Sequence, residues 1–159
     1  MTDTIWQKTE IIAWNQLLLN SYKKSLGSEL IQRQGTPEAQ AKALFFAPFV
    51  VASHGREADP LYNYGNQVLL DLWERDWEDL LKMPSRLSAE PILREERQKI
   101  LEVTATQGYF KDYQCVRISR TGKRYRIADI TLWNILDEQG NYRGQAATFS
   151  QWSLISPTI

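Results

Sequence analysis

The sequence predicts an α+β domain in which a five-stranded antiparallel sheet carries helices on one face, with an extra N-terminal helix. Two short strands are predicted at 49–52 and 61–64, and three long ones near the C-terminus. Because an isolated hairpin is only marginally stable in water, the two groups of strands are expected to join into one sheet. The helices between them then pack on one face, with a cleft between helices and sheet.

Composition limits the class of protein. The chain has 159 residues, of which 43% are apolar and six are Trp, enough to bury the core of one domain. Lys and Arg together number 19, as do Asp and Glu, so the formal net charge is zero. Binding to phosphates normally needs a basic surplus. No nucleic-acid partner is therefore expected, although a local basic patch at 117–126 is left open.

Location in the cell is inferred from segments that the sequence lacks. The single cysteine, Cys115, excludes an intrachain disulfide and a cysteine-based zinc knuckle. Residues 1–6 are polar and acidic, unlike a signal peptide. No apolar run approaches the roughly 20 residues that span a bilayer. We expect a cytoplasmic protein without a membrane partner.

The N-terminal helix is predicted over residues 4–26. Apolar residues recur every seven positions, and others extend the apolar surface to a second side. They are Ile5, Ile12, Leu19 and Leu26, with Trp6, Ala13 and Leu17 on the second side. Such a helix is covered on more than one face, by its own domain or by a partner. A homodimer through this helix is one expectation.

Capping residues and periodicity predict the other helices. Thr36 is expected to cap a helix over 36–46, with proline at the first helical position. A helical run begins at Asn66, and a longer helix is predicted over 91–106. The segments from Asn66 onward are expected to cover the sheet.

The C-terminal third is predicted to form three strands in a meander, over 113–119, 124–136 and 142–152. In the middle strand, alternation places Ile127 and Ile130 on opposite faces. Either a bulge re-aims the strand or both faces of the sheet are covered, and the sequence leaves both explanations open.

Several segments together carry a resemblance to a known family. They are "SHGREADPLYNYGN", "LWERDWEDLLKMPSRLSAEP", "REER", "VRISRTGKRYRI" and "LWNILDEQGNYRGQAATFSQW". Over about residues 46–152 they resemble the MEKHLA domain, which is itself similar to PAS domains. The chain is identified as a stand-alone member of this PAS-like family. Residues 1–35 would be an N-terminal helix and connector, and 36–159 the PAS-like MEKHLA domain.

The resemblance implies a sensory function. MEKHLA domains also form the C-terminal part of plant class III homeodomain–leucine zipper proteins, where a regulatory sensing role is suggested. The present sequence has no homeodomain, zipper or lipid-binding segment, so a DNA-binding role does not carry over. The expected function is to bind a small molecule of unknown identity in the cleft and to signal through protein interaction.

Two cofactors of PAS-like folds are not expected. Haem needs an axial ligand, usually His, and the sole histidine, His54, lies far in sequence from the helix that would face a haem. Covalent flavin photochemistry needs a cysteine on a helix, whereas Cys115 falls in a strand and is interpreted as a small buried hydrophobe. A non-covalent flavin or another small organic ligand stays open.

Seven residues are candidates for ligand binding. They are Asn66, Trp73, Arg86, Tyr113, Arg126, Trp133 and Gln145. Arg86 offers a planar fork to a carboxylate or phosphate, although a structural role is favoured for it. Trp133 is interpreted first as a core residue. A buried amide such as Gln145 needs a partner, which a ligand, a water or a side chain can supply.

Two other classes of function stay open. No nucleophile elbow, phosphate-binding glycine loop or paired-histidine metal motif is found, so no catalytic or metal-binding residue is predicted. An NTF2-like small enzyme is an alternative if Asp129 and His54 share one cavity. The other alternative is an interaction or dimerisation domain whose cleft is filled by its own side chains.

Overall fold

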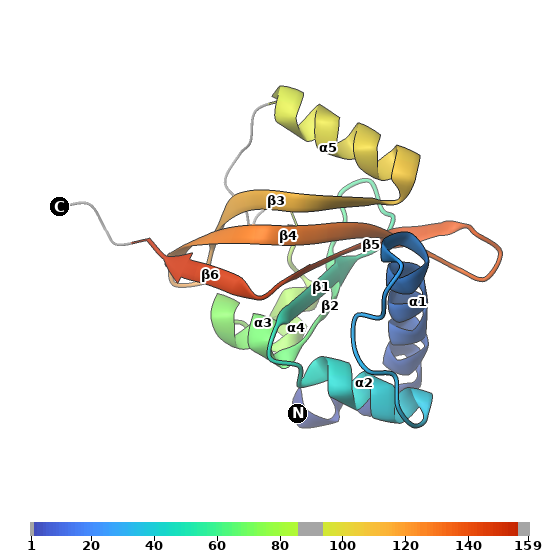
Figure 1. Cartoon of the computed structure of the whole chain (residues 1–159). Coiled ribbons are helices and arrows are strands. Elements are labelled where there is room, and N and C mark those ends of the chain that lie inside the picture. Colours follow the sequence, from blue (N-terminus) through green and yellow to red (C-terminus); the bar gives the residue numbers. More distant parts are fainter. Residues whose placement is uncertain (1, 86–93, 156–159) are drawn as a thin grey trace.

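One antiparallel sheet runs through the computed structural model, which describes residues 2–85 and 94–155 (Figure 1). The strand order is β2-β1-β5-β4-β3, and β6 pairs with β4 after β5 ends. The strands are β1 (Val50–His54), β2 (Tyr62–Gly65), β3 (Tyr109–Ile118), β4 (Arg124–Leu136), β5 (Tyr142–Phe149) and β6 (Gln151–Leu154). The predicted architecture is confirmed, except that the last expected strand is interrupted at Ser150 and gives two strands.

The helices follow the predicted order. They are a 3₁₀ helix η1 (Thr2–Gln7) and the α-helices α1 (Thr9–Leu26), α2 (Pro37–Phe45), α3 (Gln67–Trp73), α4 (Trp77–Leu81) and α5 (Arg94–Gln107). The N-cap predicted at Thr36 is confirmed, because its hydroxyl accepts a hydrogen bond from Ala39 N at 3.2 Å. The N-terminal helix differs from the expectation in beginning as a separate 3₁₀ segment before α1.

Helices cover both faces of the sheet. We call the face that contacts α3, α4 and α5 the inner face, and the face that contacts α1 the outer face. On the outer face, Trp14 Nε1 of α1 donates to Ser53 Oγ of β1 at 2.8 Å, and Ser21 of α1 bonds to Leu136 of β4. The N-terminal helix is therefore the cover of the second face, as its broad apolar surface indicated.

The change of face in β4 comes from a bulge. Cys115 of β3 pairs with Ile127, and Tyr113 with Ile130, so β4 uses one residue more than β3 between these pairs. The extra residue is Asp129, which has a left-handed backbone with φ of 55°. Both isoleucines thus reach the inner face. Since α1 also covers the outer face, both explanations left open by the sequence hold.

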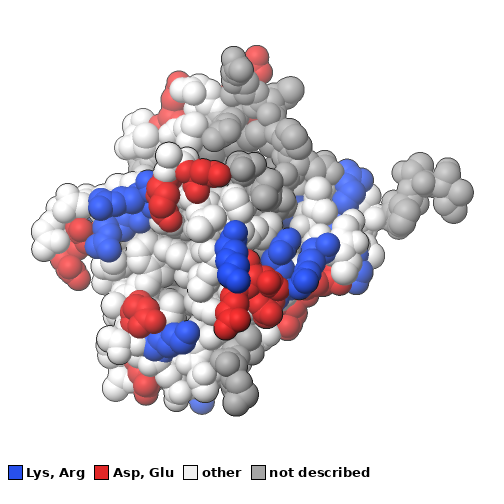
Figure 2. Space-filling view, turned by 180° about the vertical axis from the view of Figure 1, so that it is seen from behind, with Lys and Arg blue, Asp and Glu red and all other residues white. Residues whose placement is uncertain are grey.

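The surface charges are mixed. Figure 2 shows acidic and basic side chains lying side by side on the face opposite to that of Figure 1. In the basic stretch at 117–126, Arg120 pairs with Asp79 at 2.9 Å and Lys123 with Glu74 at 3.6 Å. Much of the charge of this stretch is therefore balanced locally. None of the helices in the described part of the chain combines the length and apolar character needed to cross a bilayer.

Candidate functional site

A row of polar side chains crosses the inner face at one end of the sheet. His54 of β1 pairs with Gln145 of β5, which pairs in turn with Asn134 of β4. Residues directly opposite in an antiparallel ladder point to the same face, with Cβ atoms about 5 Å apart. Asn134 Nδ2 donates to the main-chain oxygen of Thr104 in α5 at 3.3 Å. Within the described residues, the Gln145 amide has no hydrogen bond.

Two aromatic pairs join β2 to the helices on the inner face. The ring centroids of Tyr62 and Trp73 are 5.5 Å apart, and those of Tyr64 and Trp77 are 6.0 Å apart. Both pairs meet edge to face, with interplanar angles of 60° and 78°. Such pairs contribute about 1 kcal/mol each beyond the area they bury. They fix α3 and α4 against β2.

Two polar atoms in these pairs are buried without a partner. In the described structure, Trp73 Nε1 and Tyr64 Oη have no hydrogen bond. Burial raises the pKa of the Tyr64 hydroxyl, which therefore stays neutral. An unpaired buried donor costs about 1 to 3 kcal/mol, so the inner face holds hydrogen-bonding capacity that the described chain leaves unused.

Strand β3 contributes a wall of three side chains to the same face. Tyr113, Cys115 and Arg117 alternate along the strand, and Arg117 is hydrogen-bonded to the Cys115 thiol. Burial raises the pKa of both Tyr113 and Cys115, so both stay uncharged at neutral pH. Tyr62 is a further neighbour of the Arg117 charge. A half-buried guanidinium thus lies among aromatic rings and a thiol.

A family model identifies the chain. The model of the MEKHLA domain matches residues 12–154, which is most of the sequence. The chain belongs to the MEKHLA domain family. No curated protein matches the sequence.

Solved structures place this MEKHLA chain in the PAS fold. The PAS domain of a protein from Colwellia psychrerythraea has a TM-score of 0.60 and 14% identity, over 74% of this chain and 95% of that one. A light-oxygen-voltage domain studied with a flavin analogue has a TM-score of 0.56 and 15% identity, over 74% and 85%. The light-state dimer of the fungal blue-light photoreceptor Vivid has a TM-score of 0.56 and 12% identity, over 89% and 93%. The fold is therefore that of PAS and light-oxygen-voltage sensory domains.

Three of the seven predicted ligand residues lie on the inner face of the MEKHLA domain. Trp73 and Tyr113 belong to its aromatic wall, and Gln145 belongs to the polar row. Arg86 lies outside the described residues. The ligand-binding role of these residues stays a prediction.

Two predicted residues lie on the other face, which corrects their expected position in the cleft. Trp133 is fully buried against α1, where its ring meets Tyr22 edge to face at 4.9 Å. Arg126 is exposed and pairs in register with Val116 and Ser153. The reason is that α1 makes the outer face apolar too, so an aromatic residue in β4 does not by itself mark the inner side.

Asn66 is committed to the backbone of the MEKHLA fold. It is fully buried, and its Oδ1 accepts from Val51 N at 3.1 Å and from Leu69 N at 3.4 Å. Its Nδ2 donates to the carbonyl oxygens of Leu44 at 3.2 Å and Phe49 at 2.8 Å. The amide thus caps α3 and joins it to β1, which leaves little capacity for a ligand.

Three inner-face residues were not among the predicted ligand-binding residues, because the signals for them in the sequence are weaker. Alternation with Tyr113 placed Arg117 on the same side of its strand, but charge alone favoured a surface position. Tyr62 lies in a predicted strand whose two faces could not be distinguished. The sequence predicted an amide at Asn134 near the cleft, but its contact with α5 depends on helix packing that the sequence does not show.

The alternative of an NTF2-like enzyme requires His54 and Asp129 to share one cavity, and the structure places them apart. His54 is level with Asn134 across the sheet, whereas Asp129 lies five residues further along β4. At about 3.3 Å per residue this separates them by roughly 16 Å along the strand. Asp129 instead lines a hollow of about 190 Å³ together with Leu30 and Phe49. Among the described residues, no group of three or more acidic, His or Cys side chains could hold a metal ion.

Proposed function

We propose that the protein is a PAS-like sensory module that binds a small organic molecule between the inner face and helices α3 to α5. It then signals through contacts made by its N-terminal helix. The single observation that carries the proposal is the unused hydrogen-bonding capacity of the inner face, above all the buried indole nitrogen of Trp73. Buried polar groups are normally paired, and those that are not call for a partner.

The inner face also has the composition of a ligand site. Binding pockets are mostly apolar and aromatic, with a few polar groups that orient the ligand. Here, Tyr62, Trp73 and Tyr113 supply the rings. Gln145 and Arg117 supply polar groups from two different strands.

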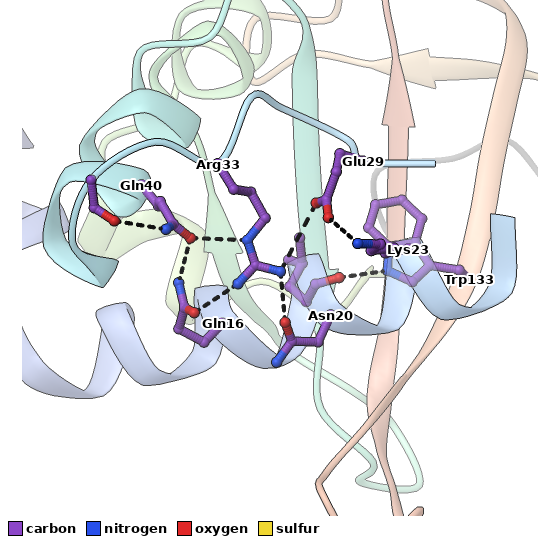
Figure 3. Close-up of polar contacts among 9 residues, drawn as sticks. Gln16, Asn20, Lys23, Glu29, Arg33, Gln40 and Trp133 are labelled. Atoms are coloured by element: carbon purple, nitrogen blue, oxygen red, sulfur yellow. Dashed lines mark hydrogen bonds and ion pairs between the residues drawn. The ribbon is translucent and has the colours of Figure 1, made fainter. Parts of the chain in front are cut away.

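Strand β4 provides a route for the signal, because neighbouring residues of this strand face opposite sides of the sheet. In β4, Asn134 faces inward and its neighbour Trp133 faces outward. Trp133 donates to the main-chain oxygen of Leu18 in α1 at 3.1 Å (Figure 3). A ligand that shifts β4 would therefore also shift the docking surface of α1.

The connector after α1 is tied to the helix by a polar network. Figure 3 shows Arg33 reaching across to side chains of α1 and α2. It donates to Asn20 Oδ1 at 2.6 Å, to Gln16 Oε1 at 2.7 Å and to Gln40 Oε1 at 2.9 Å. Any movement of α1 would have to carry the connector and α2 with it, so these elements would move as one unit.

Ligand binding is tested on the purified chain. The purified protein is denatured, and mass spectrometry shows whether a small molecule is released in stoichiometric amount. Refolded protein is then screened by thermal shift against a metabolite library. We expect at least one compound to raise Tm in a concentration-dependent way, with a smaller effect on a Gln145→Leu variant. A chain that carries no small molecule and responds to no compound would contradict the proposal.

A second candidate function is an interaction domain with a filled interior. It is favoured by the low exposure of the inner-face rings, since Tyr62, Trp73 and Tyr113 expose 6%, 3% and 9% of their surface. This function predicts a stable dimer and no ligand. Light scattering over a range of concentrations separates the two, because a monomer at all concentrations excludes a dimerisation domain.

A further inference from the structure

We propose that the hollow beside Asp129 is a second binding site, which takes a small primary amine with a short apolar body. One carboxylate, three hydroxyl groups and three apolar side chains line this hollow of about 190 Å³. They belong to Asp129, to Thr131, Thr148 and Ser150, and to Leu30, Phe49 and Phe149. Thr131 lies two residues from Trp133 in β4 and thus on the outer face, so this site is separate from the inner face. The inference goes beyond the proposed function and does not depend on it.

The hollow lies where the pairing of β4 with the C-terminal strands is interrupted. Strand β4 pairs with β5 as far as Thr131 and with β6 from Ala128 onward. Two residues of β4 are skipped between these points, and so are Phe149 and Ser150 opposite them. One of the skipped residues is Asp129, whose left-handed backbone is uncommon outside glycine. The hollow is therefore built into the backbone of the sheet.

The carboxylate of Asp129 is available to a cation. Among the described residues it forms no hydrogen bond or ion pair, and the hydroxyls of Thr131 and Ser150 have no partner either. The Thr148 hydroxyl donates to the main-chain oxygen of Val50 at 2.8 Å, so it can still accept. A primary ammonium has three donors and no acceptor, which complements a carboxylate with hydroxyl oxygens beside it.

The apolar side chains set the size of the ligand. Leu30 and Phe49 are half-buried and Phe149 is buried, whereas Asp129 and Ser150 are exposed. A hydrocarbon body can thus lie against the apolar side chains while its ammonium group stays beside the carboxylate in contact with water. Sites for drug-sized ligands usually exceed about 300 Å³. This smaller hollow therefore suits an amine with a single ring or a short chain.

The site joins the connector after α1 to the sheet. Leu30 belongs to the connector, whereas most of the other lining residues belong to β4 and β5. The connector is attached to α1 through Glu29, which pairs with Lys23 at 3.2 Å, and through Arg33, which donates to Asn20 at 2.6 Å. An amine in the hollow would contact the connector and the sheet at once. It should therefore slow hydrogen exchange in residues 28–34.

Three matched probes test the charge of the ligand. They are 2-phenylethylamine, 2-phenylethanol and 3-phenylpropionate, which share a phenyl ring on a two-carbon chain and carry a positive charge, no charge and a negative charge. Binding is followed by NMR titration of the amide signals of 129–131 and 148–150. Because exposed ion pairs are weak, we expect the amine to bind with a Kd in roughly the millimolar range. It should bind at least threefold more tightly than the alcohol, the carboxylate should bind most weakly, and added salt should reduce the preference.

Matched variants test the residue. Asp129→Asn removes the charge but keeps a side chain that tolerates the left-handed backbone, and should abolish the preference for the amine. Asp129→Gly also accepts this backbone, and serves if the Asn variant does not fold. Asp112→Asn is the control, because Asp112 has a similar backbone with φ of 61° in β3 and does not line the hollow. It should leave the preference intact.

The outcomes separate this inference from the proposed function. Equal binding of the three probes, or an amine preference that survives Asp129→Asn, would overturn the assignment of Asp129. Signals that shift around Gln145 instead of 129–131 would place the amine on the inner face and overturn the second site. If no probe binds, the second site is wrong, and the library screen with its Gln145→Leu variant still decides whether the inner face binds a ligand.

Discussion

The indole nitrogen of Trp133 donates a hydrogen bond to the main-chain oxygen of Leu18, and the two residues are 115 positions apart in the chain. The bond joins the C-terminal part of β4 to the middle of α1. The same ring also meets Tyr22, one turn further along α1. This side chain is therefore one of the polar attachments of the N-terminal helix to the sheet, beside those made by Trp14 and Ser21.

Replacing this ring tests the attachment. Trp133→Phe removes the donor and part of the buried surface, and should lower the free energy of unfolding by about 1 to 3 kcal/mol. Hydrogen exchange of the α1 amides should accelerate more than that of β5. The measurements are urea denaturation and exchange by mass spectrometry.

Trp6→Phe is the control for this substitution. The indole nitrogen of Trp6 is also buried but has no partner in the described structure, so removing it breaks no hydrogen bond. A loss of stability as large as that of Trp133→Phe would show that ring size, and not the bond to Leu18, holds the helix.

The amide of Asn15 offers a stabilising change. Asn15 lies in α1, is fully buried, and neither its nitrogen nor its oxygen has a partner among the described residues. Leucine has a similar size and no polar atoms. Asn15→Leu should therefore raise the free energy of unfolding by about 1 to 3 kcal/mol, as measured by urea denaturation.

The neighbouring amide provides the contrast. Gln16 accepts a hydrogen bond from Arg33 and donates one to Gln40, as Figure 3 shows, so Gln16→Leu should destabilise the protein. If Asn15→Leu also destabilises the protein, the Asn15 amide has a partner, such as a bound water. Burying the amide then does not lower the free energy of unfolding.

Parts of the fold that depend on local pattern were predictable. The strand expected over 124–136 has those bounds in the structure, because its turns are marked by glycine and its apolar content is high. The start of β3 was missed by four residues. Tyr109 already pairs with Trp133, but Asp112 has a left-handed backbone and a register shift falls there, which hides the alternation.

The candidate site was less predictable, because it depends on pairing between distant strands. Gln145 and His54 meet only through the register of β1 with β5. Trp133 and Trp73 look alike in sequence, and only the packing of α1 and α3 shows that they lie on opposite faces. Because helices cover both faces of the sheet, neither face is polar, and the sequence pattern therefore does not distinguish the inner from the outer face.

Asn66 is expected to be needed for folding. Removing its side chain would leave the amides of Val51 and Leu69 and the carbonyls of Leu44 and Phe49 without this partner. Asn66→Ala should therefore lower the free energy of unfolding by about 3 kcal/mol or more. Asn63→Ala, which removes one acceptor for Ser53, should cost about 1 kcal/mol. Similar losses in both variants, measured by thermal and urea unfolding, would contradict the central role of Asn66.

Glu74 makes the free energy of unfolding depend on pH in the acidic range. Its carboxylate accepts hydrogen bonds from Ser119 Oγ at 2.6 Å and Thr121 Oγ1 at 2.5 Å, and lies 3.6 Å from Lys123 Nζ. The hydroxyl bonds, first that of Ser119, lower its pKa from 4.5 to about 2. The unfolded chain therefore binds a proton that the folded chain does not, between these two values. The contribution of Glu74 is complete above about pH 4.5 and is lost as the pH falls toward 2.

Substitutions isolate this contribution. Urea denaturation at several pH values from 5.5 to 3 should show a steeper loss of stability in the wild type than in Glu74→Gln, which cannot titrate. Thr121→Val keeps the shape of the side chain and removes one donor, so its slope should lie between the two. Because Glu74 joins the end of α3 to the turn between β3 and β4, the same loss should appear as faster hydrogen exchange in that turn. Identical slopes in the wild type and Glu74→Gln would mean that the two hydroxyls do not hold the carboxylate in solution.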